Sequence, residues 1–244
     1  MEVKLGDILL KNPIIPASGT CGFGQEMSEW MDLNILGAIS TKGTTREPRY
    51  GNPLPRIAEC GACGMLNAVG LQNPGIDEVI NHEMPALRAI YNGPILANVS
   101  GFSIDEYTYV CERMDRETDA TILEVNISCP NVHNGGMAFG TTPYAAAEVT
   151  RAVKAVTKKP VYMKLSPNVT DITTIARACV EAGADGLCLI NTVLGCALTS
   201  AADNLFWLTA TEATADRESS LLPSGWSIRF VTLAPTHPSS DAEV

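Results

Sequence analysis

Short apolar runs that are rich in β-branched residues recur along the chain, and polar or glycine-containing residues close each of them. The runs cover residues 12–18, 36–43, 93–101, 120–128, 159–166 and 184–192. Near-continuous hydrophobicity of this kind is typical of parallel strands that are buried on both faces. We therefore expect six parallel strands between residues 12 and 192.

Two segments between the later runs have a helical pattern. Residues 143–157 begin with a proline and carry an apolar stripe at helical spacing. Residues 170–182 repeat this pattern and stop at Gly183, a residue that commonly ends helices. Alternation of strands and helices with short loops predicts an α/β fold.

Polar residues stand where the predicted strands end. In α/β folds, binding and catalytic residues gather at the carboxyl ends of the strands. Lys42 and Lys164 are the most informative, because lysine is seldom buried without a partner. The recurrence of polar residues at strand ends predicts a site at one edge of the sheet. It is formed by Ser18, Lys42, Asn98, Asn126, Lys164, Asn191 and Thr192.

Composition and charge exclude several classes of function. The chain has 244 residues, of which 45% are hydrophobic, enough for a substantial core. A net charge of -10 argues against binding to nucleic acid. The charged N-terminal segment does not resemble a signal peptide, and no apolar stretch is long enough to span a bilayer. We expect a cytoplasmic protein that binds neither nucleic acid nor membrane.

The 8 cysteines are scattered along the chain, so reduced thiols are expected rather than a disulfide framework. Cys60 and Cys63 form a CxxC pair, but no second ligand pair accompanies it, and we expect no metal site. Cys129 is different, because it follows the run 120–128 directly and precedes a proline. On its own, the position of Cys129 is compatible with three roles: a core residue, a metal ligand or a reactive thiol.

A series of motifs narrows these alternatives. In chain order they are NPIIPASGTCGFG, STKGTT, PRYGNPLPRIAE, GMLNAVGLQNPG, ANVSG, NISCPNVHNGG, VYMKLSPNV and GADGLCLINT. Together they resemble the class 1 dihydroorotate dehydrogenases, and SCPNV followed by GG is most similar to the class 1B catalytic subunit. The resemblance covers residues 3–195. Many motifs in the right order are far more specific than one glycine pattern.

The resemblance implies an FMN-dependent TIM (β/α)8-type barrel. The barrel is expected to be incomplete here, because the matching part of the chain has six of the eight strands. It implies Cys129 as the catalytic base. It implies FMN contacts from Ser18, Lys42, Gly43, Asn98, Asn126, Lys164 and Ile190. It implies substrate contacts from Lys42, Asn67, Ala68, Val69, Gly70, Leu71, Asn126, Asn191 and Thr192.

The chemistry of dihydroorotate oxidation suits these residue types. The substrate loses a hydride to the flavin and a proton to a protein base. A thiol, with an ordinary pKa of about 8.5, is activated when neighbouring cations lower that pKa. Asparagines can both donate to and accept from a pyrimidine ring, and a lysine can stabilise negative charge on a reduced flavin.

The resemblance also implies partners: dihydroorotate or orotate, an electron-transfer subunit that carries FAD and an iron–sulfur cluster, and a second copy of the chain in a homodimer. Two other functions stay open. One is a flavin barrel like that of dihydropyrimidine dehydrogenase, which shares the Cys-Pro-Asn strand exit. The other is a non-catalytic remnant that binds a partner subunit.

The resemblance ends at Gly195, which divides the chain into a partial barrel, 1–195, and a non-homologous tail, 196–244. The tail contains one of the 20 glycines, Gly225, and lacks an alternating apolar pattern. We expect it to be mostly irregular and not to complete the barrel. A single-base deletion at the Gly195/Cys196 junction would explain the break. The neighbouring reading frame can encode MRIDLGRRQPVLANGNGGYSGP, a glycine-rich continuation of the kind the family would show.

Overall fold

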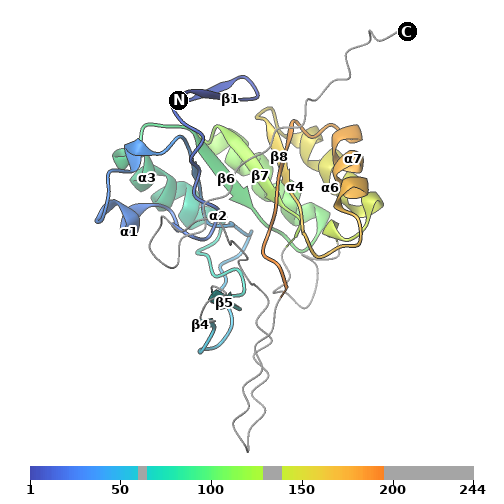
Figure 1. The fold of residues 1–244 in the computed structure, drawn as a ribbon, viewed down its shortest axis with the longest axis horizontal. Helices are drawn as coiled ribbons and strands as arrows, with labels where there is room; N and C mark the ends of the chain where they lie inside the picture. The colour runs from blue at the N-terminus through green and yellow to red at the C-terminus, as the bar shows by residue number, and fades with distance from the viewer. Residues whose placement is uncertain (60–64, 129–138, 195–244) are drawn as a thin grey trace, which may run out of the picture.

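The computed structural model describes residues 1–59, 65–128 and 139–194. At its centre is a five-stranded parallel sheet in the order β3-β6-β7-β8-β9 (Figure 1). Its strands are β3 (Ile39–Ser40), β6 (Ile95–Val99), β7 (Ile122–Asn126), β8 (Val161–Lys164) and β9 (Gly186–Cys188). Helices separate the later strands, so the predicted α/β class is confirmed. Within the described residues the sheet is open, with β3 and β9 at its edges.

Long helices cover one face of this sheet. They are α4 (Ile104–Glu117), α6 (Pro143–Val156) and α7 (Ile172–Glu181), and shorter elements α1 (Gln25–Ser28), η1 (Leu33–Ile35), α2 (Ile76–Glu78), η3 (Val79–Glu83) and α3 (Met84–Ile90) complete the layer (Figure 1). The main hydrophobic core lies between these helices and the sheet. Val125 and Met163 face it from the strands, and Met114 faces it from α4, all fully buried.

The sheet is curved, and its face opposite the helices lies on the inside of the curve; we call it the inner face. Its apolar part is a second, smaller core that includes Leu96, Ile122 and Tyr162. An antiparallel hairpin of β1 (Val3–Leu5) and β2 (Ile8–Leu10) covers this core with Leu5 and Leu10. The hairpin therefore closes the end of the sheet at which its strands begin.

The two helices predicted from the sequence are present, and their ends follow the expected signals. Pro143 occupies the first turn of α6, where Thr142 caps the helix by accepting a hydrogen bond from the backbone N–H of Ala145. Gly183 follows α7 with a φ of +102°, a left-handed conformation that glycine adopts at little cost. Helix α4 was not predicted, although Ser103 and Glu106 form a recognisable capping pair at its start.

The prediction of a strand at residues 12–18 is wrong, because this segment is not a regular strand of the sheet. Pro13 and Pro16 lack the backbone N–H that a ladder needs. The segment still runs beside β3, since the carbonyl of Ile14 accepts hydrogen bonds from the N–H groups of Gly37 and Ala38 at 2.9 and 3.4 Å. The other five predicted strands are present.

A second hairpin, β4 (Ile57–Glu59) with β5 (Met65–Asn67), lies at the other end of the sheet from the β1–β2 hairpin (Figure 1). In the described part of the chain, no helix has the length and hydrophobicity required to cross a membrane. The predicted tail, residues 196–244, lies outside the described residues, as do Cys60 and Cys63.

Candidate active site

The register of the sheet gathers polar side chains on its inner face. Asn98 pairs with Glu124, and Asn126 pairs with Lys164 in the next pair of strands. Side chains two residues apart on a strand point to the same face, so these residues continue the inner face of Leu96, Ile122 and Tyr162. The inner face is thus apolar where the strands begin and polar where they end.

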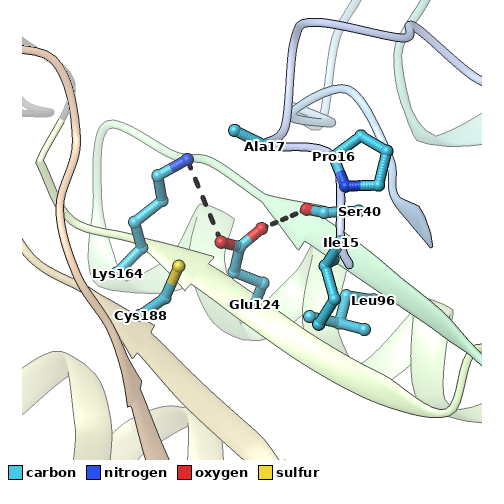
Figure 2. A pocket seen from close by; sticks show the side chains of 8 residues that line it. All are labelled: Ile15, Pro16, Ala17, Ser40, Leu96, Glu124, Lys164 and Cys188. Atoms are coloured by element: carbon cyan, nitrogen blue, oxygen red, sulfur yellow. Dashed lines mark hydrogen bonds and ion pairs between the residues drawn. The ribbon is translucent and has the colours of Figure 1, made fainter. Parts of the chain in front are cut away.

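The centre of this polar layer is the carboxylate of Glu124, which is 2% exposed. It accepts hydrogen bonds from the hydroxyl of Ser40 and from Nδ2 of Asn98, the second at 2.8 Å. Nζ of Lys164 lies 3.9 Å away (Figure 2). Burial alone would raise the pKa of this carboxyl, but the Lys164 ammonium and hydrogen bonds from Cys188, Ser40 and Asn98 outweigh it, so the pKa lies below its ordinary value.

Lys164 is buried, with 4% of its surface exposed, at the end of β8. Its ammonium group donates a hydrogen bond of 2.8 Å to Oγ of Ser18 in addition to its ion pair with Glu124. A small pocket adjoins this pair, and it is lined by Ile15, Pro16, Ala17, Ser40, Leu96, Glu124, Lys164 and Cys188 (Figure 2). The structure therefore brings Ser18 and Lys164, two of the predicted site residues, into direct contact.

Lys42 and Gly43 follow β3 at the same end of the sheet. A Cβ atom built on Gly19 would lie 3.5 Å from Nζ of Lys42, which brings this second lysine beside the Ser18 segment. A Cβ atom on Gly43 would lie 2.8 Å from Oδ1 of Asn98, too close for any side chain. Position 43 must therefore be glycine for the backbone to pack against Asn98.

A ring of hydrogen-bonded amides and hydroxyls forms the edge of the site. Nδ2 of Asn191 donates to Oδ1 of Asn126 at 3.1 Å and to Oγ of Ser128 at 2.7 Å. Nδ2 of Asn126 donates to Oγ of Ser100 at 3.3 Å. Thr192 donates to Oδ1 of Asn191 through its backbone N–H, at 2.8 Å. These contacts fix the orientation of both asparagine amides.

The predicted substrate loop, Asn67–Leu71, reaches this site at its far end. Leu71 has a φ of +57°, and it is the one residue other than glycine with a positive φ in the described part of the chain. A buried left-handed leucine is strained, which is a feature that clusters at binding sites. Its Cδ2 atom would lie 3.4 Å from a Cβ atom on Gly43, so the loop packs directly on the site.

Some predicted site residues are less well defined. Ile190 is half-buried beside Asn191, at the exit of β9. Cys129, the predicted base, lies outside the described residues. Its neighbour Ser128 is fully buried and bonded to both Asn126 and Asn191, so the last described residue of this strand exit belongs to the polar ring.

Several functional residues were missed by sequence reasoning. Ser40, Ser100, Ser128 and Glu124 are buried members of the site. Glu124 had a recognisable signal, since it is a charged residue inside the apolar run 120–128. The serines had none, because serine at a strand end is most often a turn former or a cap.

The layer has the features needed to hold a planar ring that accepts hydrogen bonds and electrons. Lys164 supplies a buried positive charge. Oδ1 of Asn98 is a buried acceptor without a hydrogen-bond partner among the described residues. A buried acceptor of this kind costs free energy unless a ligand donates to it. Among the same residues, no group of three histidine, cysteine or acidic side chains could hold a metal ion.

Several curated proteins are similar to this chain. The chain is 55% identical over 195 residues to the catalytic subunit of dihydroorotate dehydrogenase B (NAD(+)) of Geobacillus kaustophilus, a match that covers 80% of this chain and 62% of that one. It is 56% identical to the subunit of the same name from Listeria welshimeri, over 80% of this chain and 64% of that one. The subunit from Anoxybacillus flavithermus is 55% identical, with 80% and 62% covered.

The chain thus spans somewhat less than two thirds of the length of these relatives. The profile of the dihydroorotate dehydrogenase family matches residues 1–206, which is most of the sequence. The parallel α/β sheet, with its polar layer where the strands end, is the architecture expected of that family's TIM barrel. The chain therefore belongs to the dihydroorotate dehydrogenase family, with a barrel that is not closed within its described residues.

Proposed function

We propose that residues 1–195 form the flavin-ring and substrate-binding part of an FMN-dependent enzyme that oxidises dihydroorotate to orotate. The observation that carries this proposal is the buried layer of Lys164, Glu124 and Asn98 below the ring of Asn126 and Asn191. The layer offers a cation and an unsatisfied acceptor, and the ring offers amides of fixed orientation. The similarity to catalytic subunits of dihydroorotate dehydrogenase B supports the same assignment.

The lower layer would hold the flavin. FMN, when bound, supplies the acceptor for the hydride that leaves the substrate. Lys164 would place its positive charge beside the ring, where it stabilises negative charge in a site that excludes water. Oδ1 of Asn98 would accept a hydrogen bond from a ring N–H.

The upper ring would hold the substrate. Dihydroorotate alternates carbonyl and N–H groups around its ring, and an asparagine amide can pair with both. Asn126 and Asn191 are held by each other and by Ser128, so they would not need to reorganise when the substrate arrives. Lys42, close to Gly19, would supply a positive charge for the carboxylate of the substrate.

The proton would go to Cys129, the residue that follows Ser128 in the chain. The reaction balances when one ring carbon loses a hydride to the flavin and its neighbour loses a proton to the thiolate. The names of the relatives, subunits of an NAD(+)-dependent enzyme, support a second subunit that passes the electrons on to NAD(+). An association of two catalytic chains is a further part of this proposal.

Anaerobic oxidation of bound reduced flavin tests the proposal. The chain is mixed with FMN, the flavin is photoreduced, and the return of its visible absorbance is followed after addition of orotate. Orotate should reoxidise the flavin faster in the presence of the chain than in its absence, because the chain brings the two together. Reoxidation by uracil instead would favour a dihydropyrimidine dehydrogenase-like enzyme. No acceleration by either compound at saturating FMN would contradict the proposal.

A further inference from the structure

Glu124 has no part in the chemistry proposed above, yet it is the most deeply buried charge in the site. It lies in the middle of β7 on the inner face of the sheet, with 2% of its surface exposed. Placing a carboxylate there costs free energy unless cations and donors compensate it. A residue that only filled space at this position would be apolar, like Ile122 two residues earlier on the same face.

The partners of Glu124 are residues that we assign to flavin binding. Its Oε2 atom accepts from Nδ2 of Asn98 at 2.8 Å, and its Oε1 atom lies 3.9 Å from Nζ of Lys164. The hydroxyl of Ser40 donates to the same Oε2 atom from β3. One carboxylate therefore links side chains from three strands. Figure 2 shows two of these partners, Ser40 and Lys164.

The carboxylate also determines which way the amide of Asn98 points. An ionised carboxylate can only accept hydrogen bonds, so it selects the NH₂ side of the amide. The oxygen, Oδ1, is then turned away from Glu124 toward Gly43, where it has no partner among the described residues. A glutamine at position 124 could donate as well as accept, and it would remove this selection.

We propose that Glu124 is a positioning residue for the cofactor: its carboxylate anchors the ammonium group of Lys164 and turns the carbonyl oxygen of Asn98 toward the flavin site. The role of Glu124 in flavin binding rests on the proposed function. The anchoring itself is a property of the chain alone. It can therefore be tested with and without flavin.

The first test measures the anchoring without flavin. Native chain is treated with an amine-acylating reagent, and modification of each lysine is followed by mass spectrometry. Lys164 should be protected in the unmodified protein, and Glu124→Gln should raise its acylation rate about tenfold or more, since a charge-assisted contact is lost. Exposed Lys11 provides an internal reference. The control variant is Glu148→Gln, which lies on the surface of α6 and should change nothing.

Alkylation of Cys111 distinguishes loss of anchoring from loss of the fold. This thiol is fully buried in the main core, so it reacts only when the domain opens. Global destabilisation raises both rates by the same factor, so the inference predicts a larger increase for acylation of Lys164 than for alkylation of Cys111. Parallel increases would mean that Glu124 is merely structural, and unchanged acylation of Lys164 would also overturn the inference. If Glu124→Gln does not fold, Ser40→Ala removes one donor to the same carboxylate and should give a smaller increase in the same direction.

The second test measures flavin affinity in a double-mutant cycle. Glu124→Gln should weaken FMN binding about tenfold in the unmodified chain, and by much less in the Lys164→Met variant, because the effect passes through that lysine. Equal effects in both backgrounds would contradict the inference. A chain that binds no FMN at any concentration would contradict the proposed function, whereas the acylation result would still decide whether Glu124 anchors Lys164.

Discussion

Nζ of Lys164 lies 2.8 Å from Oγ of Ser18, although 146 positions separate the two residues in the sequence. Ser18 follows a segment that is not a strand but is bonded along β3 through Ile14. Lys164 ends β8, near the other edge of the same sheet. Their contact therefore crosses the inner face of the sheet and closes one side of the proposed cofactor site.

Ser18→Ala removes this contact but leaves Lys164 paired with Glu124. We expect the free energy of unfolding to fall by about 1 kcal/mol, because Ser18 is only half-buried but the buried ammonium group of Lys164 loses an acceptor. FMN affinity should fall about three- to tenfold, the effect of one hydrogen bond at a charged group. Chemical denaturation and flavin fluorescence titration measure the two quantities. Thr20→Ala, an exposed hydroxyl two residues away, should alter neither. A large loss of stability with unchanged affinity would contradict the assignment.

Asn191→Ala should destabilise the fold even without ligand. Its amide donates to Asn126 and Ser128, and its oxygen accepts from Thr192, all in buried positions. Removal leaves buried polar atoms unsatisfied, which costs about 1–3 kcal/mol of the unfolding free energy. Urea denaturation measures this. Asn52→Ala, where an exposed amide makes a hydrogen bond to the carbonyl of Ala68, is the matched control and should cost under about 0.5 kcal/mol.

Helices α6 and α7 and five of the strands could be predicted because their signals are local. Pro143 and Gly183 mark helix ends whatever the rest of the chain does. The segment 12–18 was misread because its apolar residues were weighed above its two prolines, which cannot donate to a sheet ladder. The β1–β2 hairpin was overlooked although Gly6, with a φ of +61°, and Asp7 form a short turn between its strands.

The site could be predicted only in part. Its edge residues are polar groups at strand ends, a position that the sequence reveals. The carboxylate of Glu124 is different, because its role depends on Asn98, Lys164 and Ser40, which come from three other strands. Which residues of separate strands lie opposite one another is determined by the register of the sheet, which no local pattern reveals. Long-range pairing is therefore the information that the structure adds.

The pH dependence of stability should report on Glu124. The folded state holds the pKa of this carboxyl below its ordinary value, so the carboxylate stabilises the fold above the unfolded pKa of about 4.3, and this contribution is lost as the pH falls through the folded pKa. Glu124→Gln should lower the unfolding free energy by about 3 kcal/mol at pH 7. The difference from the unmodified chain should shrink below about pH 4. Denaturation curves of both chains between about pH 3 and about pH 7 measure this difference in unfolding free energy.

Glu117 provides the contrast for that measurement. Hydrogen bonds from Arg113 and Arg116 lower the pKa of its carboxyl to about 2, but the group lies at the surface of α4. Interactions of exposed charges are screened by salt, whereas those of buried charges are screened much less. Any effect of Glu117→Gln should therefore vanish at about 1 M salt, where the Debye length is only about 3 Å. The effect of Glu124→Gln should persist. A salt-sensitive Glu124 effect would mean that the carboxylate is not buried in solution.

In a full-length version of the chain, Cys129→Ala should abolish proton removal from dihydroorotate while flavin affinity stays unchanged, because the thiol is proposed as a base and not as a cofactor contact. A loss of about a hundredfold or more is expected for a general base. Cys129→Ser should rescue activity weakly, and only at high pH. Cys60→Ala is the control for the CxxC pair and should leave turnover unchanged. Loss of flavin together with unchanged residual turnover would contradict the role of Cys129.

Alkylation offers an independent measure of the same thiol. Burial raises the pKa of Cys21 and of Cys179 to about 11, and it also raises that of Cys111. These thiols should react slowly with iodoacetamide near neutral pH, since the thiolate is the nucleophile. If Cys129 is an activated thiol, it should react faster than these three, and its labelling should be slowed by orotate. Equal rates in native protein would argue against an activated base.

The last prediction concerns the segment that follows Gly195. The glycine-rich string MRIDLGRRQPVLANGNGGYSGP, which the neighbouring frame can encode, supplies backbone N–H groups of the kind that bind phosphate, whereas residues 196–244 contain Gly225 alone. We therefore expect the 244-residue chain to bind FMN weakly, because the resemblance implies a glycine-rich phosphate-binding stretch and residues 196–244 have one glycine. Restoring one base at the Gly195/Cys196 junction should tighten FMN binding by a hundredfold or more, about 2.7 kcal/mol. Sequencing of the source DNA and flavin titration of both chains test this. Codons that cannot yield the glycine-rich string would show that the tail has another origin. Micromolar binding by the present chain would overturn the expected weak binding.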